Sequence, residues 1–218
     1  MRSSRQSEFK KILKRLETDI LSGFFHPKER LIEKSLCQRY QASRGTIRQV
    51  LKELEFKQLI NHHSNRGAVI AEPTKKEIED IFGTRVLLEN HALDFVIQNI
   101  DRQTLAQVIT YQAAFEKAAK AKNLRAIMNS NRLFHNGIFQ TCGNVVITEI
   151  IDQLRKRSHM WQHYIVGQPG RMQKTIEEHR DIVRCLQTGN ASKLKKLNEQ
   201  HLAEGYKSYM EDLTRFQN

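Results

Sequence analysis

The sequence predicts a mainly α-helical protein with two domains, a winged helix-turn-helix in residues 1–73 and an all-helical antiparallel bundle of about six helices in residues 74–218. Three observations support this fold class. Apolar residues recur at helical spacing up to residue 54, two short apolar runs follow in residues 59–70, and helical spacing then returns without any alternating run. Each of the three prolines, at positions 27, 73 and 169, stands where a helical pattern stops.

The first domain is expected to begin with three helices. In the first of them apolar residues repeat at helical spacing, and Gly23 follows as a stop signal. A short second helix is expected around residues 33–40, and Ser43 has the side chain of an N-cap for the third. The residues that define the buried faces of the first and third helices are Phe9, Ile12, Leu13, Leu16, Ile20, Ile47, Val50, Leu51 and Leu54.

A β-hairpin is expected to complete this domain. Leu59–Ile60 and Ala68–Val69–Ile70 are short apolar runs typical of strands, and the polar residues 62–67 connect them. Three helices followed by a hairpin wing indicate a winged helix-turn-helix.

The second domain is expected to be helical throughout. Thr74 and Glu77 have the spacing of a capping box, and Asp101 can cap the following helix. Further helices are expected around residues 123–140, 144–166, 170–188 and 190–213, separated by glycine-containing breaks.

Composition narrows the class of protein. The chain has 36 Lys and Arg against 24 Asp and Glu, a net charge of +12, which favours a polyanionic partner such as nucleic acid. No apolar stretch approaches the roughly 18 residues that cross a bilayer, and the charged N-terminus has no secretory core, so we expect no membrane partner. The three widely spaced cysteines argue against a disulfide framework. We therefore expect a reducing, cytoplasmic location.

The start of the third helix contains the candidate DNA-reading residues. Arg44 and Arg48 share one helix face and can contact a guanine edge or phosphate. Ser43 and Thr46 can donate hydroxyl groups to phosphate, and Lys34 is placed to meet the DNA backbone. The wing tip, which includes Arg66, could reach the flanking groove. The alternative is a solvated basic helix with no DNA role.

Four residues of the second domain form a candidate metal site. Asn131 and His135 lie side by side on one helix face, while His179 and His201 belong to two later helices. Imidazoles from three helices that converge inside a bundle can bind a divalent metal. The alternative is chance spacing, because nine histidines in 218 residues produce some such pairs.

The first domain resembles the DNA-binding domain of GntR-type bacterial transcription regulators over about residues 8–72. The resemblance rests on Ser43-Arg44, on Thr46-Ile47-Arg48, on the Leu51/Leu54 core and on the segment 65–67. It implies a homodimer that binds a short palindromic operator in a bacterial cell. The DNA contacts that it implies are Lys34, Arg44, Thr46, Arg48, Arg66 and Gly67. This chain departs from the family pattern at two positions. Gly45 stands where the family usually has Pro or Thr, and Gln58 stands after the recognition helix where the family usually has Gly.

Residues 78–213 resemble the FCD type of effector domain, which follows the GntR-type wing in the FadR-like subfamily. The resemblance rests on Arg85-Val-Leu-Leu-Glu89, Asn131-x-x-Phe134-His135, residues 178–182 and His201-Leu202. Many members bind a metal through one Asp and three His, which implies a metal site at Asn131, His135, His179 and His201.

Asn131 stands where the family usually has Asp, so the site loses one negative charge. Zn²⁺ or Ni²⁺ then suits the site better than Mn²⁺, unless the change leaves it empty. Such a centre would favour an anionic effector, and Arg85 is either a second anchor for its carboxylate or an ion-pair partner of Glu89.

These expectations favour a DNA-binding transcription regulator, and repression is the expected mode, because a protein seated on a promoter blocks access without further contacts. The helical domain would sense a small carboxylate metabolite and form the homodimer. A metal-dependent hydrolase with a basic appendage is one alternative, but Glu178, beside His179, is a poor general base since adjacent helical residues do not face the same way. A non-specific nucleic-acid-binding protein is the other. We expect no enzymatic activity.

Overall fold

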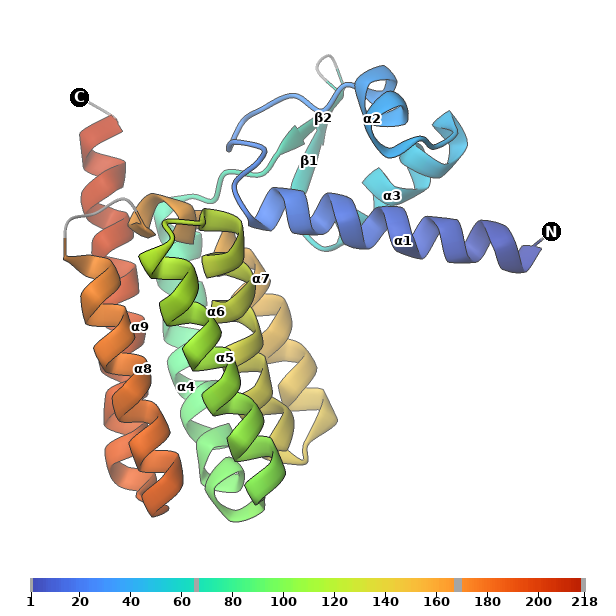
Figure 1. The fold of residues 1–218 in the computed structure, drawn as a ribbon. Coiled ribbons are helices and arrows are strands. Elements are labelled where there is room, and N and C mark those ends of the chain that lie inside the picture. Colours follow the sequence, from blue (N-terminus) through green and yellow to red (C-terminus); the bar gives the residue numbers. More distant parts are fainter. Residues whose placement is uncertain (1, 65–66, 167–169, 217–218) are drawn as a thin grey trace. The chain divides into compact units, whose positions relative to one another are not determined.

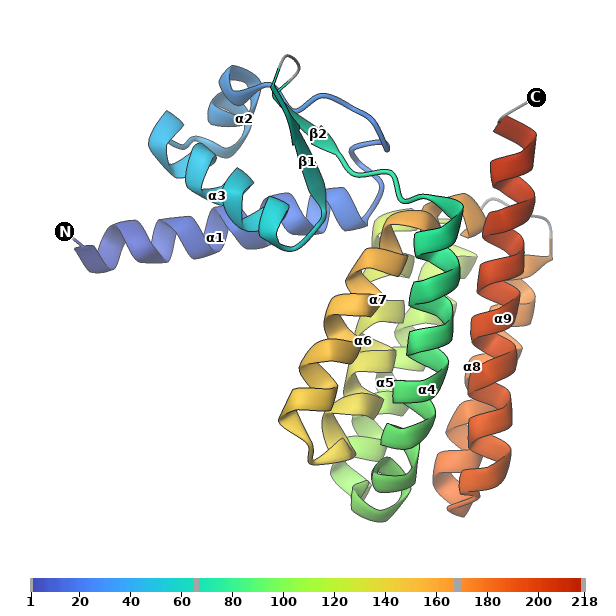
Figure 2. The same cartoon turned by 180° about the vertical axis from the view of Figure 1, so that it is seen from behind.

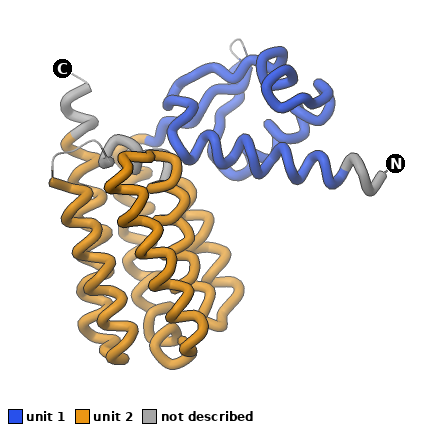
Figure 3. The backbone as a smooth tube through the Cα atoms, viewed as in Figure 1, with its two compact units in different colours: residues 1–73 blue, residues 74–218 orange. Residues whose placement is uncertain are grey.

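The computed structural model describes residues 2–64, 67–166 and 170–216. The chain divides into two compact units, residues 1–73 and residues 74–218 (Figure 3). Helices account for most of both units, and a two-stranded antiparallel sheet belongs to the first. The mainly α-helical fold class expected from the sequence is therefore confirmed. None of the helices in the described part of the chain is long and apolar enough to cross a membrane.

The first unit has the element order of a winged helix-turn-helix. Its elements are α1 (Arg2–Leu21), α2 (Glu33–Tyr40), α3 (Arg44–Phe56), β1 (Ile60–His63) and β2 (Gly67–Ile70) (Figure 1). The two strands pair so that Ile60 faces Ile70 and His63 faces Gly67. Leu16, Ile47 and Leu54 have no exposed surface, so the apolar stripes of α1 and α3 form the core of this unit.

The turn after α3 is made without a glycine. Gln58 has φ of +58°, in the left-handed region that L-residues rarely adopt. Its N–H donates to the carbonyl of Glu55 at 2.8 Å, and the Leu59 N–H donates to the carbonyl of Leu54 at 2.9 Å. These bonds end the helix and lead into β1, so the chain keeps a glycine-like turn while it has a glutamine at that position.

The second unit is a bundle of long helices. Its elements are α4 (Lys75–Asn99), α5 (Arg102–Lys120), α6 (Leu124–Phe139), the 3₁₀ turn η1 (Gln140–Cys142), α7 (Val145–Val166), α8 (Arg171–Thr188) and α9 (Ala191–Phe216). Figures 1 and 2 show these helices lying side by side. Thr74 and Glu77 form the expected capping box of α4, and Asp101 caps α5 through the Thr104 N–H. Both predicted helix starts are confirmed.

The interior of the bundle contains polar groups as well as an apolar core. Leu93, Val96, Val108 and Phe134 are among the buried apolar residues that join α4, α5 and α6. The buried polar residues that are important for the site are Arg85, Glu89, Gln112, Asn131, His135, Arg155, Arg171 and His179. Buried titratable groups are uncommon in a core unless they are paired or functional, so this cluster marks the candidate site of the unit.

Candidate metal centre and nucleic-acid interface

The start of α3 is capped by its own polar side chains. The Ser43 hydroxyl accepts from the Thr46 N–H at 3.1 Å, which confirms the predicted N-cap. The two hydroxyl oxygens also lie 2.9 Å apart in a hydrogen bond. Ser43 and Thr46 therefore hold the first turn of the helix together, and its remaining N–H groups and positive dipole end favour an anion such as phosphate.

Arg44 and Arg48 are both exposed on α3, while Ile47 between them is buried. Arg48 Nε donates to both carboxylate oxygens of Glu33 on α2, at 2.9 and 3.1 Å. Within the described residues its two terminal amino groups make no hydrogen bond, and the side chain stays 66% exposed. Glu33 thus orients a guanidinium whose remaining donors are available to a base edge or a phosphate.

The other predicted DNA contacts lie in α2 and the wing. Lys34 is exposed in the first turn of α2. Gly67 begins β2 with φ of +70°, and no atom lies within 4 Å of where a Cβ would stand, so backbone conformation explains the glycine. Arg66 lies outside the described residues.

Three histidines from three helices meet inside the second unit. His135 of α6, His179 of α8 and His201 of α9 each offer a ring nitrogen, and these atoms lie within 4.8 Å of one another. The ring centroids of each pair are 5.0 or 5.1 Å apart. The structure therefore brings together the three imidazoles that the sequence placed on separate helices.

The protonation of His179 is determined by Gln112 of α5. Gln112 Nε2 donates to Glu116 Oε1 at 3.1 Å and to the Ile176 carbonyl at 3.4 Å, so its Oε1 faces His179 Nδ1 at 2.9 Å. An amide oxygen only accepts, so the proton of His179 is on Nδ1. Nε2 then carries the lone pair, and it is buried with no hydrogen-bond partner among the described residues.

His201 is oriented in a similar way by Glu178 of α8. Its Nδ1 lies 2.7 Å from Glu178 Oε2, and the other oxygen of Glu178 accepts from Arg171 Nη1 at 3.0 Å. A carboxylate behind an imidazole is the usual support of a metal-binding histidine. The position of Glu178 beside His179 makes it a poor general base. Glu178 instead hydrogen-bonds to Nδ1 of His201.

Burial keeps the other two imidazoles neutral. Burial, with Arg155 and the neighbouring histidines, holds the pKa of His135 well below 6.5. Burial, with His201 and Arg155, does the same for the pKa of His179. Nε2 of His135, like that of His179, is buried without a hydrogen-bond partner in the described chain. Neutral imidazoles with unsatisfied nitrogens in one place fit a borderline divalent metal such as Zn²⁺.

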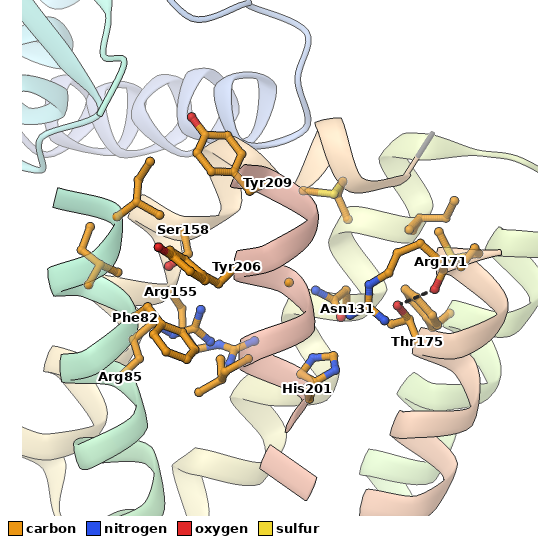
Figure 4. A pocket seen from close by; sticks show the side chains of 18 residues that line it. Phe82, Arg85, Asn131, Arg155, Ser158, Arg171, Thr175, His201, Tyr206 and Tyr209 are labelled. Carbon is orange, nitrogen blue, oxygen red and sulfur yellow. Dashed lines mark hydrogen bonds between the residues drawn. The ribbon is translucent and has the colours of Figure 1, made fainter. Parts of the chain in front are cut away.

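A cavity of about 100 Å³ opens beside the histidines. Asn131, one turn before His135 on α6, lines it together with His201, and Figure 4 shows the amide near Arg171. Arg85 and Arg155 also line the cavity and lie beside Phe82 in this view. The cavity therefore combines three guanidinium groups with one side chain of the histidine cluster.

Arg85 makes the ion pair that the sequence offered as one of two alternatives. Its Nε donates to Glu89 Oε1 at 2.8 Å, and Arg155 Nη1 of α7 donates to the same oxygen at 3.3 Å. Glu89 is fully buried, and both arginines are less than a tenth exposed. Since Arg85 also lines the cavity, the ion pair and a role toward a bound anion are compatible.

Three residues of this site were not identified by sequence reasoning, namely Gln112, Arg155 and Arg171, and Glu178 was considered only as a general base. Gln112 and Arg155 lie 67 and 66 residues from their partners His179 and Glu89. No local spacing relates such pairs. An arginine in an otherwise apolar helical stripe was the available signal for Arg155.

The chain matches the FCD domain family over residues 80–204 and the family described as "Bacterial regulatory proteins, gntR family" over residues 9–70. It is 24% identical to the HTH-type transcriptional regulator McbR of Escherichia coli over 200 residues, which cover 89% of this chain and 90% of that protein. It is 23% identical to the HTH-type transcriptional repressor GlaR of E. coli, over 86% of this chain and 89% of GlaR. The solved structure of E. coli McbR/YncC superimposes with a TM-score of 0.82 at 22% identity and covers 97% of this chain and 99% of that one, which supports the shared fold.

Proposed function

Because the chain belongs to the GntR family of bacterial regulatory proteins and contains an FCD domain, we propose that it is a transcriptional repressor with a metal centre that senses a small carboxylate. Relatives along most of its length are HTH-type transcriptional regulators and repressors, which points to a DNA-binding regulator rather than an enzyme. The observation that carries the sensing half is the convergence of His135, His179 and His201 beside a cavity with buried arginines.

DNA recognition is assigned to the N-terminal turn of α3. Arg44 and Arg48 are exposed there, Ser43 and Thr46 order the turn, and Glu33 orients Arg48. Arginine is the side chain that most often reads guanine in the major groove. Lys34 and the wing, with Arg66 and Gly67, are assigned to the phosphate backbone and the flanking groove. A homodimer would present two such surfaces to a palindromic operator.

The metal is assigned to His135, His179 and His201, with the Asn131 amide oxygen as a fourth donor. Imidazole and a neutral oxygen suit Zn²⁺ or Ni²⁺ better than Mn²⁺. When bound, the ion supplies positive charge and a coordination position for a carboxylate oxygen. Gln112 and Glu178 hydrogen-bond to Nδ1 of His179 and of His201. Supporting contacts of this kind to metal-binding histidines commonly raise the affinity for the metal.

The carboxylate is assigned to the cavity beside this centre. Arg171 and Arg155 are both buried, and both line the cavity. Their positive charges would stabilise an acid bound there, and Arg85 adds a third. Binding would then change the affinity for operator DNA by coupling the two units.

The DNA half is tested by selecting binding sites from random duplexes at a fixed salt concentration, with chelator-treated and zinc-loaded protein. The proposal expects a palindromic site in at least one sample, and binding that changes when metal and acid are added. Equal affinity for all sequences with a steep salt dependence would instead support the non-specific alternative. Hydrolysis of a substrate by the zinc-loaded chain would support the enzyme alternative.

A further inference from the structure

Much of the cavity wall is apolar. Phe82 of α4 and Tyr206 of α9 stack with their ring centroids 5.1 Å apart and an interplanar angle of 25° (Figure 4). Phe115, Met128 and Leu202 line the same space. Side chains of this kind gain free energy when they cover hydrocarbon and lose it when they cover an unpaired hydroxyl group.

Three hydroxyl groups of the cavity wall donate hydrogen bonds within the protein. The Ser158 hydroxyl donates to the Leu154 carbonyl at 2.9 Å, and the Thr175 hydroxyl donates to the Arg171 carbonyl at 3.0 Å. Both hydroxyl oxygens keep lone pairs that can accept a hydrogen bond. The Tyr206 hydroxyl donates to Glu79 at 3.3 Å, and Glu79 is not part of the cavity wall.

The strongest hydrogen-bond donors of the cavity wall are cationic. Arg155 is 2% exposed and Arg171 8% exposed, and both line the cavity. In Figure 4 Arg155 lies near Phe82, and Arg171 lies apart from it near Asn131 and Thr175. A carboxylate group suits the positive charge of these two side chains.

On the basis of the proposed acid-sensing role, we infer that the effector is a carboxylate with a mainly hydrocarbon body, of aliphatic or aromatic type. The cavity of about 100 Å³ holds about seven to ten water-sized groups, which is roughly the size of benzoate or hexanoate. Sugar acids are disfavoured by this chemistry, because many of their hydroxyl groups would be buried against the apolar part of the wall.

The test compares hexanoate with gluconate, since both are six-carbon monocarboxylates and differ in their hydroxyl groups, and adds benzoate for the stacked aromatic wall. Each acid is titrated calorimetrically into the full chain, once after chelator treatment and once with one equivalent of zinc sulfate. We expect hexanoate or benzoate to bind at least about 100-fold more tightly than gluconate in one or both samples.

A variant pair locates the binding. Phe82→Ala removes the stacked wall at a half-buried position and should weaken benzoate binding about tenfold or more while zinc binding stays unchanged. Leu87→Ala removes an apolar side chain that is 73% exposed on the same helix and is not part of the cavity wall, so it should leave benzoate binding unchanged. Equal losses in both variants, or no loss in Phe82→Ala, would place the acid elsewhere and overturn the inference.

The three acids test the hydrocarbon-acid inference and the proposed acid sensing separately. Gluconate binding as tightly as hexanoate would overturn the hydrocarbon-acid inference and leave acid sensing in place. Failure of all three acids to bind in both samples would overturn this inference together with the proposed acid sensing, while the DNA-binding role would still be judged by site selection.

Discussion

Nδ1 of His179 and Oε1 of Gln112 lie 2.9 Å apart in the interior of the second unit. This contact holds the proton on Nδ1 and leaves the buried Nε2 with a free lone pair. His201 has an equivalent support in Glu178, at 2.7 Å from its Nδ1. Two of the three imidazoles are thus oriented by an oxygen acceptor at Nδ1, which is how metal-binding histidines are usually held.

Replacement of Gln112 should weaken zinc binding without removing a ligand. In Gln112→Ala the acceptor for His179 Nδ1 is lost, and the dissociation constant for zinc should rise about 10- to 100-fold. A competition titration with a chromogenic chelator measures it. Gln173→Ala is the matched control, because Gln173 is exposed on α8 and bonds to Glu177. An unchanged dissociation constant for zinc in Gln112→Ala would show that Gln112 does not support the metal site.

Glu89 should stabilise the second unit in a pH-dependent way. Burial alone would raise the pKa of Glu89, but Arg85 and Arg155 outweigh it and hold the pKa below its usual value. A lowered folded pKa means that the stabilisation is present above the unfolded value, about 4.3, and is lost as the pH falls through the folded pKa. Glu89→Gln should therefore lower the free energy of unfolding by about 3–5 kcal/mol at pH 7, since it leaves two buried arginines without their carboxylate.

Urea unfolding at a series of pH values tests this expectation. The difference between Glu89→Gln and the unaltered chain should narrow as the pH falls below about 4.3. Glu177→Gln, at an exposed position on α8, should change the free energy of unfolding by no more than about 0.5 kcal/mol. A constant difference at all pH values would mean that the Glu89 charge is not what stabilises the unit.

Arg48 should carry sequence discrimination. Arg48→Ala is expected to cost about 1–3 kcal/mol on the selected operator and to flatten the preference for it over a scrambled duplex. Fluorescence anisotropy at fixed salt measures both. Lys117→Ala removes an exposed positive charge from α5 in the other unit and should leave the preference intact. If Arg48→Ala weakens binding to both duplexes equally, Arg48 contacts phosphate and does not read a base.

Glycine substitutions in the turn after α3 and inside α2 should change the free energy of unfolding in opposite directions. Gln58→Gly should relieve the left-handed backbone conformation and raise the free energy of unfolding by about 0.5–1 kcal/mol. Gln38→Gly, at an exposed position inside α2, should lower it by about 1 kcal/mol. Thermal and urea unfolding of the two variants give the comparison. A loss of stability in Gln58→Gly would show that the left-handed conformation is not strained there.

Local signals predicted the helices well. Ser43, Thr74 and Asp101 each cap a helix where the sequence places them, because a capping residue bonds only within its own first turn. The winged fold follows from the same kind of short-range pattern. Gln58 is an exception to these local rules. The turn at Gln58 has φ of +58°, in the left-handed region that a glutamine rarely adopts.

The candidate site was predictable in part. The four residues Asn131, His135, His179 and His201 were identified from spacing and from the family resemblance, and the structure brings the three imidazoles together. Their occupancy by a metal stays a prediction. Gln112 was not identified and Glu178 was considered only as a general base, because both residues contact a histidine on another helix.

The contacts of Arg85 were likewise only partly predictable from the sequence. Its partner four residues on, Glu89, is visible in the sequence, but the second arginine on that carboxylate comes from α7. The ion pair therefore becomes a buried three-residue network only through packing. The apolar wall of the cavity likewise forms from α4, α5, α6 and α9 together, so no single helix reveals it.

Zinc stoichiometry of the chelator-treated full chain tests the metal centre most directly, measured by calorimetric titration alongside His179→Ala and an exposed wing control, His63→Ala. We expect about one zinc ion per chain, a higher thermal midpoint in its presence, the same result for His63→Ala, and loss of both effects in His179→Ala. Absence of saturable zinc binding, or zinc binding that His179→Ala leaves unchanged, would contradict a three-histidine metal centre in this protein.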